Sequence, residues 1–134
     1  MTVLVYVGAN KGETLHTKLG LFDRIIAFEP DPIAFSLLAD RIGHQPHVTL
    51  VNAACAEQDG FADLYVTSNT YSNSLSIATS STFDRYGPGH FEVTRTEKVR
   101  TVNLCSYLMS CGFDKIDLLH TDAQGMDLTI LRTL

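Results

Sequence analysis

The sequence predicts an α/β protein in which helices cover both faces of a mostly parallel sheet. Two observations predict this fold: short β-branched apolar runs alternate with helix-like segments, and those segments contain their own start and stop residues. The chain has 134 residues, of which 45% are hydrophobic, and this is enough for one ordinary core. We therefore expect a single domain over residues 1–134, with an irregular Ser/Thr-rich insertion at about 67–97.

The first half of the chain predicts three strands and two helices in alternation. One helix-like segment covers residues 13–19. In the other, Asp31 can cap the helix, Pro32 lies in the first turn and Gly43 ends the helix. Uninterrupted apolar runs are typical of strands that are buried on both faces. Such runs cover residues 3–7 and 25–28, and residues 48–54 predict a third strand.

The second half is less regular. Residues 61–66 follow an Asp59-Gly60 turn signal and predict a strand that lies antiparallel at the outer edge of the sheet. Residues 67–82 predict a loop, and residues 98–102 predict a strand before a helix that Asn103 caps and Gly112 ends. The last predicted elements are a buried strand at 116–121 and an amphipathic helix at 126–134. Right-handed crossovers then give the parallel order third, second, first, fourth, with residues 3–7 in the centre.

Charge and cysteine content exclude several classes of partner and site. The net charge is −5 and the basic residues are scattered, so we expect no nucleic-acid partner and no membrane partner. The three cysteines are odd in number and form no C-x-x-C pair, which favours reduced thiols in the cytoplasm. No segment reads as a membrane span or a signal peptide, and the histidines lack the spacing of metal ligands.

The stretch VGANKG after the first strand predicts a ligand site. In doubly wound sheets a tight glycine loop approaches the ligand, and an acidic residue about 20 positions later accepts the ribose hydroxyls. Glu29 stands at that distance from Gly8. The dinucleotide pattern G-x-G-x-x-G would need glycines where the chain has Asn10 and Glu13, so S-adenosylmethionine fits better than NAD. The alternative is that Gly8 only ends a strand and Glu29 is a solvated strand end.

Four segments, VGANKG, AFEPDP, VNAACAEQDG and IDLLHTDAQGMDLTIL, occur in an order and spacing that resemble the FkbM family of S-adenosylmethionine-dependent methyltransferases. The resemblance extends from residue 3 to residue 134. It implies a Rossmann-like three-layer sandwich with a mostly parallel sheet. It also implies methylation of a hydroxyl group on a small molecule, since many members methylate sugars or natural products.

The resemblance also implies a set of cofactor-binding residues. The loop residues would surround the methionyl part of S-adenosylmethionine, and Glu29 would bind the ribose. The turn that contains Ala53 and Ala54 would lie beside the adenine. Asp122 would face the sulfonium, whereas Asp31 either helps at the adenosine or serves only as a helix cap. The complete set is Gly8, Ala9, Asn10, Gly12, Glu29, Asp31, Ala53, Ala54 and Asp122.

Two residues near the end of the fourth parallel strand are candidates for the catalytic base. His120 and Asp122 are two positions apart on one predicted strand, so their side chains share a face of the sheet. Either can accept the proton of a hydroxyl acceptor. The alternatives are a hydrogen-bonded core histidine for His120 and a helix cap for Asp122.

The sequence departs from the family pattern at three places. Tyr6 stands where the family usually has an Asp, and Gln124 and Asp127 stand where Glu is more frequent. The family fold has seven strands, so the fold predicted here is incomplete and leaves strand 116–121 as an exposed edge. We expect this edge to form a homo-oligomer or to aggregate, unless residues 67–82 cover it. These departures favour an alternative function, a non-catalytic Rossmann-like remnant or interaction module with weak nucleoside binding.

Overall fold

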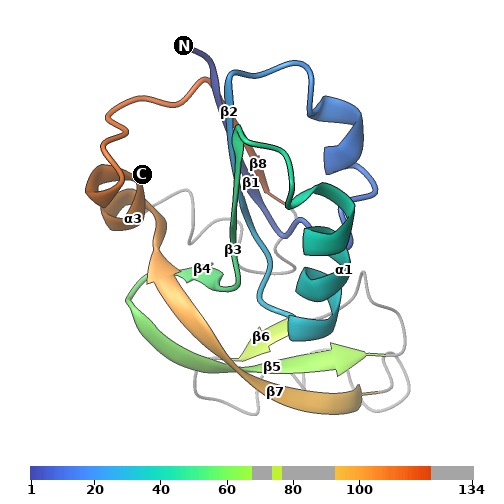
Figure 1. Cartoon of the computed structure of the whole chain (residues 1–134). Coiled ribbons are helices and arrows are strands. Elements are labelled where there is room, and N and C mark those ends of the chain that lie inside the picture. The colour runs from blue at the N-terminus through green and yellow to red at the C-terminus, as the bar shows by residue number, and fades with distance from the viewer. Residues whose placement is uncertain (68–73, 77–92, 122–134) are drawn as a thin grey trace.

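The computed structural model describes residues 1–67, 74–76 and 93–121. Its centre is a four-stranded parallel sheet, sheet A, with the strand order β3-β2-β1-β8 (Figure 1). The predicted order of the parallel strands, with the first strand inside the sheet, is therefore confirmed. The strands are β1 (Val3–Val7), β2 (Arg24–Phe28), β3 (Val48–Val51) and β8 (Leu118–Thr121).

Helices lie on both faces of sheet A, as expected for a Rossmann-like α/β fold (Figure 1). Successive side chains of a strand point to opposite faces, so β1 contributes to two separate cores. Val5 packs in the cluster that contains Leu104 and Leu108 of α3, whereas Leu4 packs in the cluster that contains Leu38 of α1. The helices are α1 (Pro32–Ile42), α3 (Leu104–Ser110) and the short 3-10 helix η1 (Leu15–Lys18).

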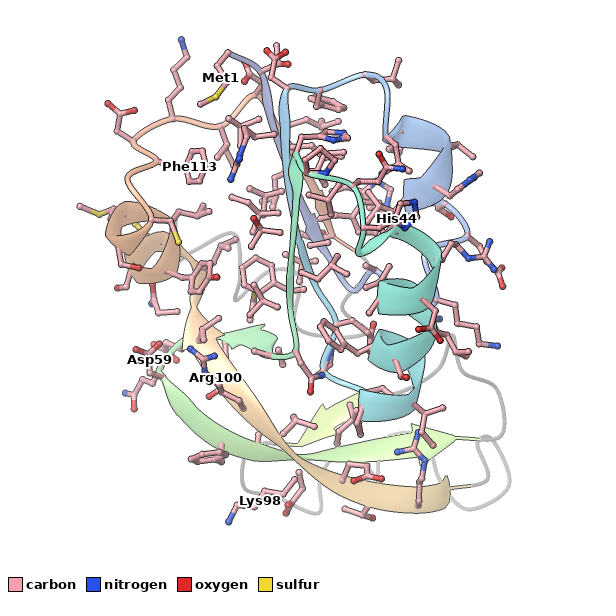
Figure 2. All side chains as sticks on the ribbon, viewed as in Figure 1. Met1, His44, Asp59, Lys98, Arg100 and Phe113 are labelled. Atoms are coloured by element: carbon pink, nitrogen blue, oxygen red, sulfur yellow. The ribbon has the colours of Figure 1, made fainter. Side chains whose placement is uncertain are left out.

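Side chains that come after the two helices also lie on opposite sides of sheet A. Figure 2 shows Phe113, which follows α3, and His44, which follows α1, on opposite sides of sheet A. Phe113 is partly buried against the core on the α3 side. The central sheet thus separates two apolar layers, and this is the reason that its strands are apolar at nearly every position.

The predicted helix caps are confirmed. The side chain of Asp31 accepts a hydrogen bond from the N–H of Ile33 at 3.0 Å, and Pro32 occupies the first helical position of α1. The side chain of Asn103 accepts a hydrogen bond from the N–H of Ser106 at 3.0 Å at the start of α3. Both helices therefore begin where the sequence predicts.

A second sheet, sheet B, was not predicted. Its order is β4-β7-β5-β6, and it lies beyond the carboxyl ends of sheet A (Figure 1). The expectation that residues 61–66 pair at the outer edge of the parallel sheet is wrong, because β5 pairs antiparallel with β7. The prediction of one strand over 48–54 is also wrong, because the chain turns after Val51 and continues as β4 in sheet B. The strands of sheet B are β4 (Ala54–Ala56), β5 (Gly60–Thr67), β6 (Ser74–Ser76) and β7 (Val93–Asn103).

Other element boundaries differ from the predictions for local reasons. The helix predicted at 13–19 is only the single 3-10 turn η1, in which Leu15 is the one buried residue and Thr14 makes no side-chain cap. The loop predicted at 67–82 contains β6, which pairs with β5. The strand predicted at 98–102 is longer in both directions, because β5 pairs with almost all of β7. The helix predicted at 126–134 lies outside the described residues.

Burial of Cys55 predicts a difference in thiol reactivity. Removing the thiolate from water raises the pKa of Cys55 from 9.0 to about 12, whereas Cys111 is exposed. We expect a thiol reagent at pH 8 to modify Cys111 in the native protein and Cys55 only after unfolding. The raised pKa also means that stability falls above about pH 9, because the unfolded chain then releases a proton that the folded chain keeps. Equal labelling rates for the two cysteines in the native protein would contradict the placement of Cys55.

The edge strand β8 predicts self-association. Within the described part of the chain β8 pairs only with β1, and its Leu118 side chain is 44% exposed. An exposed apolar edge is a template for pairing with a second chain. We expect light scattering over a concentration series to show association that Leu118→Lys reduces and that Met109→Lys, on exposed Met109 of α3, leaves unchanged. A monomer at every concentration would show that this edge is not an interface.

Candidate functional site

The candidate site lies where β1, β2 and β3 end side by side. In a parallel sheet these carboxyl ends share one edge, and ligands of open α/β sheets bind beyond that edge. Gly8 follows β1, Glu29 follows β2 and Asn52 follows β3. The chain therefore brings together three segments that are far apart in the sequence.

The glycine loop is folded back on the end of β2. Gly8 and Gly12 have positive φ values of 84° and 83°, and Asn10 has a φ of 54°. Asn is among the few residues other than Gly that adopt this left-handed conformation readily. The N–H groups of Gly8 and Ala9 both donate to the carbonyl of Phe28, at 2.9 and 3.0 Å. These two N–H groups therefore hold the loop on β2.

Glu29 holds the same loop through its carboxylate. Its Oε1 accepts a hydrogen bond from the N–H of Asn10 at 2.8 Å, and its Oε2 accepts one from the N–H of Asp31 at 2.8 Å. The residue is only 6% exposed, so it is not the solvated strand end that the sequence left as an alternative. Hydrogen bonds from backbone N–H groups to a carboxylate are among the stronger ones in proteins. Glu29 therefore joins the end of β1 to the start of α1.

The segment after β3 is fixed to the same place by Asn52. Its Nδ2 donates to the carbonyl of Glu29 at 2.8 Å and to the carbonyl of Pro30 at 3.2 Å. Ala53 is fully buried in the core on the α3 side, and Ala54 begins β4. The sequence predicted that the turn containing Ala53 and Ala54 lies at the site. It did not identify the side-chain amide of Asn52 as the group that holds this turn in place.

Sequence reasoning also missed Arg95. Its Nη2 lies 2.6 Å from Oδ1 of Asp31, and its Nη1 lies 2.7 Å from Oε1 of Glu97. Burial alone lowers the pKa of Arg95, but the hydrogen bonds to Asp31 and Glu97 outweigh this and raise the pKa above its ordinary value. Asp31 is therefore more than a helix cap, because it also forms an ion pair with Arg95 of sheet B. No spacing rule in the sequence connects two residues that are 64 positions apart.

Comparison with known families identifies the chain. The family model of the methyltransferase FkbM domain matches residues 7–134. The chain belongs to this FkbM methyltransferase family. A search of the curated proteins and a search of the solved structures gave no significant match. The resemblance noted in the sequence is thus confirmed over essentially the whole chain.

Tyr6 lies in β1, two residues before Gly8 of the glycine loop. Its ring stacks on the ring of His120, with the centroids 4.2 Å apart and the planes at 10°. Tyr6 is 3% exposed and belongs to the core on the α1 side. His120 therefore lies beside Tyr6, its register partner on β1, whereas Asp122, Gln124 and Asp127 lie outside the described residues.

A small hollow lies against the glycine loop of this FkbM domain. Its volume is about 20 Å³, close to that of a site for one water molecule. This hollow by itself is therefore too small for a ligand as large as a nucleoside. The hollow is lined by Tyr6, Gly8, Ala9, Asn10, Lys11, Glu13 and Thr14.

Two searches of the described residues gave negative results. They contain no group of three or more His, Cys, Asp or Glu side chains that could hold a metal ion. None of the helices that the structure describes is long and apolar enough to cross a membrane.

Proposed function

We propose that this FkbM methyltransferase domain uses S-adenosylmethionine to methylate a hydroxyl group of a small molecule such as a sugar or a natural product. The observation that carries the proposal is the buried carboxylate of Glu29 at the carboxyl end of β2, joined directly to the glycine loop after β1. Open α/β sheets bind nucleosides at this place, and a carboxylate there accepts ribose hydroxyls. The three free cysteines support the reducing cytoplasm as its location.

The residues at the site fit the proposed cofactor. S-adenosylmethionine presents hydrogen-bond donors, namely two ribose hydroxyls and an ammonium group, and carries no phosphate. The site offers acceptors: the carboxylate of Glu29 after β2, and Oδ1 of Asn10 in the glycine loop, which is buried and accepts no hydrogen bond from the described residues. A buried acceptor without a donor is costly, so a bound donor at Asn10 would remove that cost. Glu13 near the loop disfavours a pyrophosphate, as expected for a cofactor other than NAD.

The mechanism assigns a limited task to each residue. Bound S-adenosylmethionine supplies an electrophilic methyl group on a sulfonium. Methyl transfer is an in-line displacement, so the protein accelerates it mainly by holding donor and acceptor in line. Glu29 and Asn10 orient the donor, and His120 or Asp122 accepts the proton of the acceptor hydroxyl. The stacking of Tyr6 on His120 fixes the plane of the imidazole.

Calorimetric titration tests the cofactor assignment. We expect S-adenosylmethionine and S-adenosylhomocysteine to bind with one-to-one stoichiometry, and NAD at the same concentration to give no binding heat. Binding of NAD alone would indicate an oxidoreductase. The absence of binding by all three compounds would exclude the proposed function.

A second candidate function is favoured by Tyr6. An acidic side chain at this position would help to hold an ammonium group, and Tyr6 is instead a buried core residue. This favours a domain that binds a nucleoside weakly and does not catalyse transfer. Release of S-adenosylhomocysteine in the presence of a panel of sugar and phenolic hydroxyl acceptors distinguishes the two functions, because only an active methyltransferase produces it.

A further inference from the structure

We propose that Arg95 is a positioning residue for the cofactor site, because it neutralises the buried Asp31 and so fixes the backbone to which Glu29 is bound. This inference rests on the proposed function for its effect on cofactor binding. Arg95 belongs to β7 in sheet B, whereas the site lies at the end of sheet A. The second sheet would thereby take part in the geometry of a site that it does not itself contain.

The carboxylate of Asp31 is buried. Its side chain is 2% exposed, so an ionised carboxylate there needs a nearby cation. Arg95 supplies the cation at 2.6 Å and is itself 25% exposed. Removing Arg95 would take the neighbouring cation and its 2.6 Å hydrogen bond away from this buried carboxylate. The segment around Asp31 would then lose the contact that holds it against β7 of sheet B.

Asp31 is connected to the glycine loop through hydrogen bonds to Glu29. The backbone N–H of Asp31 donates to Oε2 of Glu29, and Oε1 of Glu29 accepts the N–H of Asn10, each at 2.8 Å. A displacement of Asp31 therefore changes the position of the Glu29 carboxylate and of the loop. Arg95, Asp31, Glu29 and Asn10 form one continuous series of contacts from sheet B to the end of β1.

The guanidinium of Arg95 is held in a fixed orientation. Glu97, two positions along the same strand, accepts a hydrogen bond from Nη1 of Arg95 at 2.7 Å. Residues two apart on a strand share a face, so Glu97 holds the planar group while Nη2 points to Asp31. A lysine at position 95 has one point charge and cannot keep both contacts in this arrangement.

Affinity measurements on matched variants test the inference. We expect Arg95→Ala to weaken the binding of S-adenosylhomocysteine about tenfold, because a charged hydrogen bond that positions the site is lost. Arg95→Lys should recover part of the affinity. Arg100→Ala is the control, since Arg100 is an exposed arginine on the same strand, at its end nearer α3 (Figure 2). Equal affinities of the Arg95→Ala and Arg100→Ala variants would overturn the inference.

A double mutant separates charge neutralisation from simple packing. Asp31→Asn removes the charge and keeps the helix cap, because Asn caps helices as well as Asp does. In the Asp31→Asn background, Arg95→Ala should change the affinity less than twofold. The same tenfold loss in both backgrounds would show that Arg95 acts by packing and would overturn the proposed role.

Amide hydrogen exchange in the free protein gives a readout that does not depend on cofactor binding. We expect Arg95→Ala to speed exchange of the N–H groups of Asn10 and Asp31, which donate to Glu29, and to leave the amides of β1 unchanged. Unchanged exchange at both N–H groups would overturn the inference. Faster exchange in a protein that does not bind S-adenosylhomocysteine would uphold the positioning role of Arg95 and exclude the proposed function.

Discussion

Glu29→Gln is expected to weaken the binding of S-adenosylhomocysteine and also to destabilise the fold. A ribose hydroxyl bound to a carboxylate makes a charge-assisted hydrogen bond, and its loss should reduce the binding free energy by about 1–3 kcal/mol. The carboxylate also accepts the N–H groups of Asn10 and Asp31, one at each oxygen. Glutamine has a single acceptor oxygen, so one of these N–H groups would face an amide N–H₂. A buried donor left without an acceptor should lower the free energy of unfolding by about 1–3 kcal/mol.

The two effects of Glu29→Gln are measured separately. Titration calorimetry gives the affinity, and urea denaturation gives the free energy of unfolding of the free protein. Glu57→Gln is a matched control, because Glu57 is exposed and lies away from the glycine loop, before β5. Unchanged affinity in a folded variant would remove the ribose-binding role of Glu29. Unchanged stability would contradict its two backbone contacts.

The parallel core could be predicted from the sequence because its signals are local. Residues 3–7 and 25–28 are apolar at nearly every position, which is typical of strands covered on both faces, and β1 and β2 are indeed buried along almost their whole length. The caps Asp31 and Asn103 are equally local, since each bonds to an N–H two or three residues later. Such elements are determined by neighbours in the chain.

Sheet B could not be predicted because its pairing is distant in the sequence. β5 and β7 pair along nearly their full length, although an irregular Ser/Thr-rich segment lies between them in the sequence. Residues 48–54 were predicted as one strand, and only the partner strand β7 explains why Ala54 leaves sheet A. Strand length and choice of partner here depend on tertiary contacts, which override local preference.

The site was predicted in its position but only in part in its contacts. The interval between Gly8 and Glu29 predicted that these two residues lie at one edge of the sheet, because it depends on one strand-helix-strand unit. The backbone bonds of Glu29, the amide of Asn52 and the ion pair of Arg95 depend on three-dimensional distances that no spacing rule contains. The roles at the cofactor of all the predicted residues, those of the glycine loop, Glu29 and Asp31 as well as Ala53, Ala54 and Asp122, stay predictions.

Leu38→Ala is expected to be strongly destabilising. Leu38 is fully buried on α1 in the core that contains Leu4 and Tyr6, and truncation of such a leucine lowers the free energy of unfolding by about 2–5 kcal/mol. Its neighbour Leu37 is 45% exposed, so Leu37→Ala removes the same atoms from a position that buries less of them. In urea denaturation of both variants, Leu37→Ala should lower the free energy of unfolding by less than about 1 kcal/mol. Equal costs would contradict the orientation of α1.

Leu38 also connects this core to the glycine loop, and a double mutant should reveal that connection. A Cβ atom at Gly12 would lie 2.8 Å from Cδ1 of Leu38, and the φ of Gly12 is +83°. Gly12→Ala therefore carries two costs, the contact with a packed side chain and about 1–2 kcal/mol of backbone strain. Leu38→Ala removes the contact and leaves the strain, so Gly12→Ala should cost less in the Leu38→Ala background than in the parent protein. Denaturation of all four proteins measures the difference, and strictly additive costs would show that the loop does not rest on Leu38.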